Sequence, residues 1–242
     1  MKTVNKLNWF FQRESLLLLS KASLFLFVFA LPFSVRTLIY DQVAYQNGLF
    51  SDFLASFLYL PEIFLALALF FFALGFFQGA KTKLKWGPKK LGKTVLLVFL
   101  ASLLPYFWAE DPSLVFFSGL KLLEFLLLYF LLQNLSLKLK NLLLVMVSSL
   151  VLQAALGGLQ FLFQSSLGLH FLGEAHLSPE IPGVAKFIWQ GEKYIRAYGT
   201  TPHANVLAGL LAIGFFLTVL LVDLLRKSKK LLNKKKKRIF WG

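Results

Sequence analysis

The feature that most restricts how this chain can fold is a series of long apolar segments separated by short charged ones. A helix needs ~20 predominantly apolar residues to cross a bilayer. Six segments approach or exceed that length, and they cover residues 15–35, 53–77, 94–108, 113–133, 142–163 and 203–222. The third is short and contains Pro105, so its outer end is expected to be irregular. We therefore predict an all-α fold, a polytopic bundle of about six transmembrane helices in a single membrane domain over residues 1–242.

Composition supports lipid as the solvent for much of this chain. Residues of the hydrophobic set make up 57% of the 242 positions, against roughly 45–50% apolar residues in soluble domains. One soluble core could not bury that much apolar surface. The chain has no cysteine, which excludes disulfides, thiolate catalysis and cysteine-based metal sites. The three histidines lack metal-site spacing and no glycine pattern would cradle a phosphate, so no metal and no cofactor are expected.

The distribution of charge predicts the orientation in the membrane. Lysines and arginines gather before the first apolar segment, in 81–93, in 138–140 and in a basic tail, 223–242. The other side receives an outer loop, 164–202, and these acidic residues: Asp41, Asp52, Glu110 and Asp111. Because short loops rich in Lys and Arg stay in the cytoplasm, both termini are predicted to be cytoplasmic. The net charge of +15 then reflects topology, and the tail is interpreted as an anchor that contacts anionic lipid rather than nucleic acid.

The outer loop is the only long segment that is predicted to lie outside the membrane. Loops of this length in compact proteins are usually functional or disordered. This one contains Phe187, Ile188, Trp189 and Tyr194, a composition unlike that of a disordered linker. We expect it to lie on the outer membrane surface, with its aromatic side chains at headgroup depth.

The junction between this loop and the last apolar segment combines groups that favour an anion. Thr200 or Thr201 could cap a helix whose first turn contains Pro202, because a proline there loses no hydrogen bond. The start of such a helix presents free N–H groups and the positive end of its dipole. Arg196 precedes it across the flexible Gly199, and its planar guanidinium suits bidentate binding of phosphate. The sequence therefore predicts an anion site at the outer membrane face.

One face of the last helix is predicted to pack closely on another helix. Its members lie at i, i+3, i+4 and i+7: Asn205, Ala208, Gly209 and Ala212. Small residues allow two helices to approach, and the asparagine can form a hydrogen bond across the contact.

Two strings of residues carry a resemblance to a known family. The first runs Arg196-Ala197-Tyr198-Gly199-Thr200 and then Pro202-His203-Ala204-Asn205-Val206-Leu207-Ala208. The weaker second string runs Trp108-Ala109-Glu110-Asp111-Pro112 and then Lys121-Leu122-Leu123-Glu124. They resemble the O-antigen ligase and O-antigen polymerase family of membrane glycosyltransferases, whose pattern is Arg-x-x-Gly-Thr followed by Pro-x-x-Asn at the entry to a helix.

The resemblance implies transfer of a glycan from a polyprenyl-diphosphate carrier to an acceptor at the outer face of the cytoplasmic membrane. No metal is used in that family. Its loop arginine, to which binding of the carrier's diphosphate is attributed, corresponds to Arg196. Together with the anion site predicted at the helix start, this gives as substrate-binding residues Arg196, Gly199, Thr200, His203 and Asn205. The partners implied are the lipid-linked glycan and membrane lipids, with no nucleic acid.

Only the N-terminal half of the family pattern is covered. The family's second arginine and its essential histidine come later in the pattern, and this chain has no counterpart of that region. Residues 237–242 look like a cytoplasmic loop that enters a seventh helix. We therefore expect a truncated chain that contains no catalytic residue of its own.

Two residues of the predicted anion site have simpler interpretations. Arg196 could pair with Glu192 or contact lipid headgroups. His203 could be a catalytic base, since histidine titrates near neutral pH, or only a residue at the helix terminus.

Charged residues inside the apolar segments also have two interpretations. Lys121 and Glu124 lie at i and i+3 in the fourth segment, where they can pair directly. Because intramembrane charges are costly, they are candidates for the lining of a cavity, but they could simply neutralise each other. Glu62, which follows Pro61, carries a weaker indication of the same kind.

Two other functions stay open for the whole chain. A small membrane transporter would show an internal repeat, and none is evident between residues 1–120 and 121–242. A non-catalytic membrane partner would act in a complex through the small-residue face of the last helix.

Overall fold

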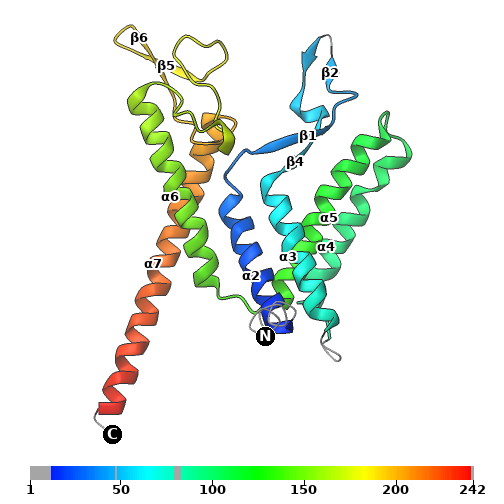
Figure 1. Ribbon diagram of the computed structural model, residues 1–242, viewed down its shortest axis with the longest axis vertical. Coiled ribbons are helices and arrows are strands. Elements are labelled where there is room, and N and C mark those ends of the chain that lie inside the picture. The colour runs from blue at the N-terminus through cyan, green and yellow to red at the C-terminus, as the bar shows by residue number, and fades with distance from the viewer. Residues whose placement is uncertain (1–11, 47, 79–82, 241–242) are drawn as a thin grey trace, which may run out of the picture. The chain divides into compact units, whose positions relative to one another are not determined.

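A computed structural model of the protein describes residues 12–46, 48–78 and 83–240 (Figure 1). They belong to two compact units. The first consists of Met1–Phe27 and Arg36–Leu137, and the second of Val28–Val35 and Lys138–Gly242.

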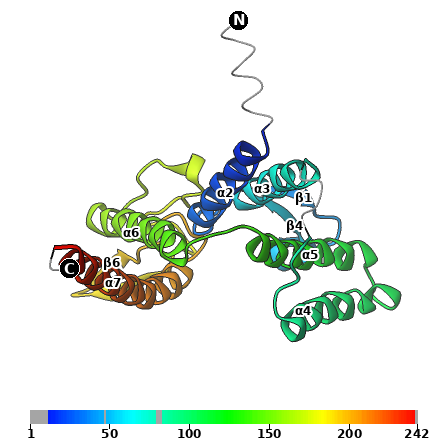
Figure 2. The ribbon, with the colours of Figure 1, turned by 90° about the horizontal axis from the view of Figure 1, so that it is seen from below.

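The first unit contains most of α2 and all elements from β1 to α5. In chain order they are α2 (Arg13–Ala30), β1 (Arg36–Tyr40), β2 (Tyr45–Gln46), β3 (Leu49–Phe50), the 3-10 turn η1 (Asp52–Leu54), β4 (Ser56–Tyr59), α3 (Leu60–Phe77), α4 (Lys89–Ser102), the 3-10 turn η2 (Leu104–Phe107) and α5 (Pro112–Asn134). Strands β1 and β4 pair antiparallel, as do β2 and β3. In Figure 2, α3 lies beside α2, and the hydroxyl of Ser20 donates to the carbonyl of Ala68 at 2.7 Å.

Local sequence explains where two helices of this unit begin. Helix α3 has Pro61 in its first turn, and the Glu62 carboxylate accepts from the N–H of Tyr59 at 3.2 Å. Helix α5 begins with Pro112, and Asp111 accepts from the N–H groups of Ser113 and Leu114 at 2.9 and 3.3 Å. Both caps satisfy N–H groups that have no partner inside the helix.

The second unit is built on two helices and the loop between them. Its elements are α6 (Leu139–Phe163), the 3-10 turn η3 (His170–Leu172), β5 (Lys186–Trp189), β6 (Glu192–Ile195) and α7 (Ala204–Phe240). Helices α6 and α7 lie side by side in both views (Figures 1 and 2). Glycines allow this contact: a β-carbon at Gly157 would lie 2.9 Å from the Leu207 side chain, and one at Gly214 would lie 2.9 Å from Leu150.

The prediction of a mostly helical chain with several apolar helices long enough to span a membrane is confirmed. The described residues are mostly helical, and five helical segments are long and apolar enough to cross a membrane: Leu60–Phe77, Lys89–Phe107, Pro112–Asn134, Leu139–Phe163 and Ala204–Lys229. Helix α2 is outside this set because its 18 residues include three charged ones, Arg13, Glu14 and Lys21.

Two predicted boundaries were wrong. The segment 53–77 is helical only from Leu60, because the apolar residues before it form η1 and β4. The segment 15–35 is helical only to Ala30, since Pro32 prevents continuation. Apolar composition alone does not distinguish a spanning helix from an apolar strand beside it.

Helix α4 ends before the end of the predicted span 94–108, whereas α7 extends beyond the end of the predicted span 203–222. The irregular end at Pro105 is confirmed, because α4 ends at Ser102 and the 3-10 turn follows. Helix α7 continues through the predicted tail as far as Phe240, in a stretch rich in leucine and lysine, both good helix formers.

The predicted small-residue face of α7 does not contact α6. All its members are exposed within the described part of the chain: Asn205, Ala208, Gly209 and Ala212. The face of α7 that is buried carries Ala204, Leu207, Gly214 and Leu221 instead. Within the described residues the predicted contact at this face is not made, because α6 packs on the neighbouring face, where Leu207 and Leu221 are buried and Gly214 lets Leu150 approach closely.

Candidate functional site

Two glutamines on α6 hold the segment that contains the candidate anion-binding residues. Gln153 and Gln160 lie two turns apart on one face of α6 and are 0% and 1% exposed. A buried amide is costly unless it is hydrogen-bonded. Both side chains satisfy this condition with the backbone and side chains of residues that precede α7.

Gln160 bonds to both the N–H and the carbonyl of one residue, Gly199. Its Oε1 accepts from the N–H groups of Tyr198 and Gly199 at 3.1 and 2.7 Å. Its Nε2 donates to the carbonyl of Gly199 at 2.7 Å and to Glu174 at 2.8 Å. One side chain therefore fixes this stretch and connects it to a second part of the loop 164–202.

Gln153 binds the next residue, Thr200, in a similar way. Its Oε1 accepts from the N–H of Thr200 at 2.9 Å, and its Nε2 donates to the Thr200 hydroxyl at 2.6 Å. The carbonyl of Thr200 accepts from the N–H of Ser34 at 3.1 Å. Each of these polar groups of Thr200 is thus occupied inside the protein.

Glu174 connects the first part of the loop 164–202 to the same network. It is 5% exposed, and its carboxylate accepts from the N–H groups of Leu167 and Leu169, both at 2.6 Å, and from Gln160. Burial by itself would raise the pKa of Glu174. These hydrogen bonds to the charged form outweigh burial and hold the pKa below its usual value.

Gly199 is required by the backbone and by its neighbours. Its φ of +59° lies in the left-handed region, which favours glycine. A β-carbon there would collide with the side-chain oxygen of Gln153 and would lie 3.4 Å from Leu207. The close fit against α6 explains why this position carries no side chain.

The start of α7 differs from the expected cap. The helix begins at Ala204, so Pro202 lies before it. The Thr201 hydroxyl donates to the carbonyls of Tyr198 and His203 at 2.7 and 3.0 Å instead of accepting from helix N–H groups. His203 takes the capping role, because its Nδ1 accepts from the N–H of Asn205 at 3.1 Å. The prediction that a threonine caps this helix was wrong, since the threonines are committed to the loop and to α6.

Three of the predicted site residues present side chains at the surface. Arg196, His203 and Asn205 are exposed, whereas Gly199 and Thr200 are buried. Arg196 follows β6 directly, and its N–H donates to the carbonyl of Ala185 at 2.9 Å. The capping bond of His203 occupies Nδ1 as an acceptor, which leaves the proton on Nε2.

The expected alternative partner of Arg196 is engaged elsewhere. The Glu192 carboxylate accepts from the Tyr194 hydroxyl at 3.0 Å, and this bond raises the pKa of Tyr194. Among the residues that the structure describes, the guanidinium of Arg196 makes no ion pair.

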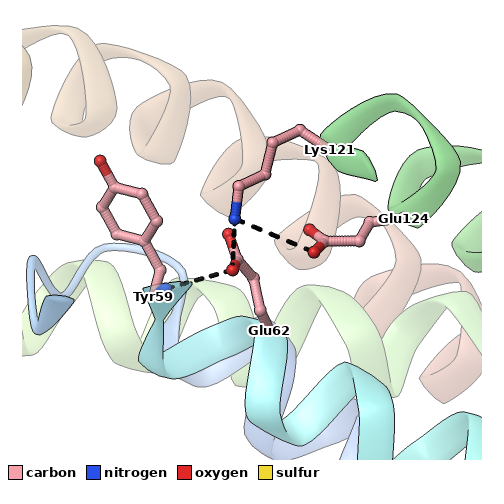
Figure 3. A network of polar contacts seen from close by, with 4 residues as sticks. All are labelled: Tyr59, Glu62, Lys121 and Glu124. Atoms are coloured by element: carbon pink, nitrogen blue, oxygen red, sulfur yellow. Dashed lines mark hydrogen bonds and ion pairs between the residues drawn. The ribbon is translucent and has the colours of Figure 1, made fainter. Parts of the chain in front are cut away.

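A second polar cluster lies in the first unit (Figure 3). Lys121 of α5 reaches the first turn of α3, where its Nζ lies 2.5 Å from Glu62 Oε2 and 3.9 Å from Glu124 Oε1. Its Nζ is also 5.7 Å from the centroid of the Tyr59 ring, within the range of a cation–π interaction. The predicted pairing of Lys121 with Glu124 is therefore the longer of two contacts, and Glu62 is the closer partner. Two carboxylates face one ammonium.

Hydrogen bonds tie together the loops at each end of this unit. At one end, the Tyr40 hydroxyl donates to Asp111 at 2.8 Å, which raises the pKa of Tyr40. For Asp111, partial burial is outweighed by that bond and by backbone N–H groups, so its pKa is lowered. At the other end, Asn134 exchanges two hydrogen bonds with the backbone of Lys85, at 2.8 and 2.9 Å.

A salt bridge joins β1 to the connection before β4. Arg36 lies 2.8 Å from Asp52 and 3.9 Å from the centroid of the Phe57 ring. For Arg36, burial is outweighed by the hydrogen bonds to its charged form, so its pKa is raised.

The sequence interpretation missed Gln153, Gln160 and Glu174. A usable indication was present: two glutamines spaced by seven residues in an otherwise apolar segment lie on one helix face. Their partners could not be identified, because residues 198–200 are distant in the sequence.

In the described ranges, no group of three or more His, Asp or Glu side chains could hold a metal ion. Comparisons with protein-family models, with curated proteins and with solved structures find no match. The function of this chain is therefore inferred from its sequence pattern and from the geometry and chemistry of its own residues.

Proposed function

We propose that this chain binds a polyprenyl-diphosphate-linked glycan at the outer face of the cytoplasmic membrane, as the donor-binding part of an O-antigen ligase- or polymerase-like membrane glycosyltransferase. The observation that carries the proposal is Arg196. Its guanidinium is exposed and makes no ion pair with any described residue, while the backbone that comes after it is held by two buried glutamines. A cation on a backbone already ordered can bind a diphosphate without the cost of ordering the loop.

The other site residues take different roles in this proposal. Arg196 grips the diphosphate, and the exposed His203 and Asn205 add polar groups at the positive end of the α7 dipole. Gly199 and Thr200 fix the loop, because their N–H groups already donate to Gln160 and Gln153. The polyprenyl tail lies along apolar helix surface.

The proposed topology has six crossings, with α2 as the first and both termini in the cytoplasm. Two of the charged residues of α2, Arg13 and Glu14, lie in its first turn, where they can reach the interface. The bonds Tyr40–Asp111 and Lys85–Asn134 support this grouping, because each joins segments that the topology assigns to the same side.

The test measures binding by the whole chain in lipid nanodiscs, with undecaprenyl diphosphate as the probe. Replacement of Arg196 by Ala should raise Kd about tenfold or more, since a charge-assisted hydrogen bond contributes about 1.5–3 kcal/mol. The Kd of Arg196→Lys should lie between those of the wild type and Arg196→Ala, because the point charge of a lysine replaces the bidentate guanidinium. Lys193→Ala, a neighbouring exposed cation, is the matched control. Equal affinity of wild type and Arg196→Ala would remove the assignment.

One observation favours a second candidate, a non-catalytic membrane partner. The small residues Ala208, Gly209 and Ala212 form an exposed face on α7, of the kind that a neighbouring transmembrane helix can approach closely. Gly209→Leu should then release a co-purifying membrane polypeptide without a change in affinity for undecaprenyl diphosphate. Purification of the wild-type chain alone would count against this candidate.

A further inference from the structure

An aromatic row connects the last turn of α6 with the β5–β6 hairpin. Phe187 stacks on Phe161, with ring centroids 6.2 Å apart and ring planes at 16°. Tyr194, the cross-strand neighbour of Phe187, stacks on it at 5.6 Å. Trp189 continues the row, 6.3 Å from Tyr194.

This row remains largely uncovered by the rest of the protein. Phe161 is 42% exposed, Phe187 40% and Trp189 61%. Leu162 and Phe163, beside Phe161 at the end of α6, are 74% and 66% exposed. Large apolar side chains left this open usually mark an interaction surface.

The place of Phe161 in α6 indicates how deep the aromatic row lies relative to the membrane. Phe161 belongs to a helix that is long and apolar enough to cross a membrane, and it lies in that helix's last turn. Phe187 is stacked on Phe161, so the hairpin reaches the level of the spanning helix rather than standing clear of it. The exposed aromatic surface is therefore continuous with the lipid-facing surface of α6.

We propose that Phe187, Tyr194 and Trp189 form a membrane-docking surface that holds the β5–β6 hairpin in the headgroup region of the outer leaflet. Rings of Trp and Tyr favour this interfacial layer because one part is apolar and the other can form hydrogen bonds. Strand alternation and register place Phe187, Trp189 and Tyr194 on one face, where the carboxylate of Glu192 accepts from the Tyr194 hydroxyl. The occupant of this surface is the phospholipid bilayer.

Docking would also set the depth of Arg196, which directly follows β6. That consequence rests on the proposed function, since a carrier's diphosphate lies at headgroup depth. The docking itself does not depend on what Arg196 binds.

The absence of cysteine allows a direct measurement of depth. The whole chain, carrying one substitution to cysteine and a nitroxide label, is reconstituted in vesicles of phosphatidylethanolamine and phosphatidylglycerol. The label at Trp189→Cys should collide readily with oxygen and lose collision with a water-soluble nickel chelate. It should resemble a label at Leu162→Cys and differ from one at Glu180→Cys, an exposed position on the same loop.

A second measurement leaves the hairpin intact. Lipids with a quencher near the headgroup should reduce the fluorescence of the wild-type chain more than that of Trp189→Phe. Water-like accessibility at position 189, or equal quenching of the two proteins, would overturn the docking. Protection of position 189 by added glycan alone would overturn it in favour of a sugar platform. Arg196→Ala should keep the docked depth, which separates this outcome from a failure of the proposed function.

Discussion

In the first unit an ammonium and two carboxylates meet between α3 and α5, whereas in the second a pair of neutral glutamines on α6 binds the backbone of a loop. Both arrangements place polar groups among apolar helices, where an unsatisfied group is costly. The charged cluster joins one helix to another. The amide network joins a helix to a loop, because an amide carries both a donor and an acceptor and can match a peptide.

The difference shows what each region can do. Opposite charges neutralise each other at the cost of their hydration, so removing one member leaves an uncompensated charge. Amides carry no net charge, and the loss of one leaves unpaired N–H and C=O groups in the segment next to Arg196. The first cluster therefore concerns the stability of the helix pair, and the second concerns the shape of the candidate site.

The largest effect is expected from removal of the single cation of the charged cluster. Lys121→Ala leaves Glu62 and Glu124 without their counter-charge. We expect a loss of about 3 kcal/mol in the free energy of unfolding, the lower end for a broken buried pair, because the Lys121 side chain is 34% exposed. Denaturant unfolding in detergent measures it. The triple variant Lys121→Met, Glu62→Gln, Glu124→Gln should recover most of the loss, and failure to recover would show that the charges are not the cause.

Removal of the central amide should have a somewhat smaller and more local effect. Gln160→Ala leaves the N–H groups of Tyr198 and Gly199 unpaired, and we expect a loss of about 2 kcal/mol, since one buried unsatisfied group costs about 1–3 kcal/mol. Hydrogen exchange at those two amides should accelerate, while the first unit keeps its protection. Ser148→Ala, at an exposed position on the same helix, is the matched control. Unchanged exchange in Gln160→Ala would contradict the role assigned to the network.

Two glycine substitutions compare the loop that packs on α6, which contains Gly199, with the exposed face of α7, which contains Gly209. Gly199→Ala adds a β-carbon against Gln153 at a positive φ, and we expect a loss of about 1–2 kcal/mol from backbone strain. Gly209→Ala adds one where no atom other than the adjacent backbone of α7 lies within 4 Å, so it should be neutral or stabilising by up to about 1 kcal/mol. Thermal unfolding of the two variants measures the contrast. Equal shifts would show that the loop is not held closely against α6.

The smallest effect concerns pH. The pKa of Glu174 is lowered in the folded protein, so its contribution to stability is present above the unfolded value of about 4.3 and is lost as pH falls through the lower folded pKa. Glu174→Gln should be less stable than the wild type at pH 7, and the difference should shrink as the pH falls below about 4. Comparison of unfolding at about pH 7 and about pH 3.5 measures it. A difference that does not change with pH would show that the charge of Glu174 contributes nothing.

Much of the helical layout could be predicted, since apolar length and the prolines act locally. Pro105 marked the end of α4, and Pro61 explains why α3 begins at Leu60 rather than at residue 53. Less of the candidate site could be predicted from the sequence. Arg196 and Gly199 were identified from a resemblance and from local rules, but the glutamines that hold this segment came only with the fold.

What the sequence by itself determined is a chain of long apolar helices with charged connections, because hydropathy and charge are properties of each segment. Only the tertiary structure decided that Glu62 is the nearer partner of Lys121, that His203 rather than a threonine caps α7, and that Gln153 and Gln160 bind residues 198–200. Each of these is a choice among several available partners. That choice depends on which groups folding brings within about 3 Å, the reach of a hydrogen bond, and no local pattern contains this information.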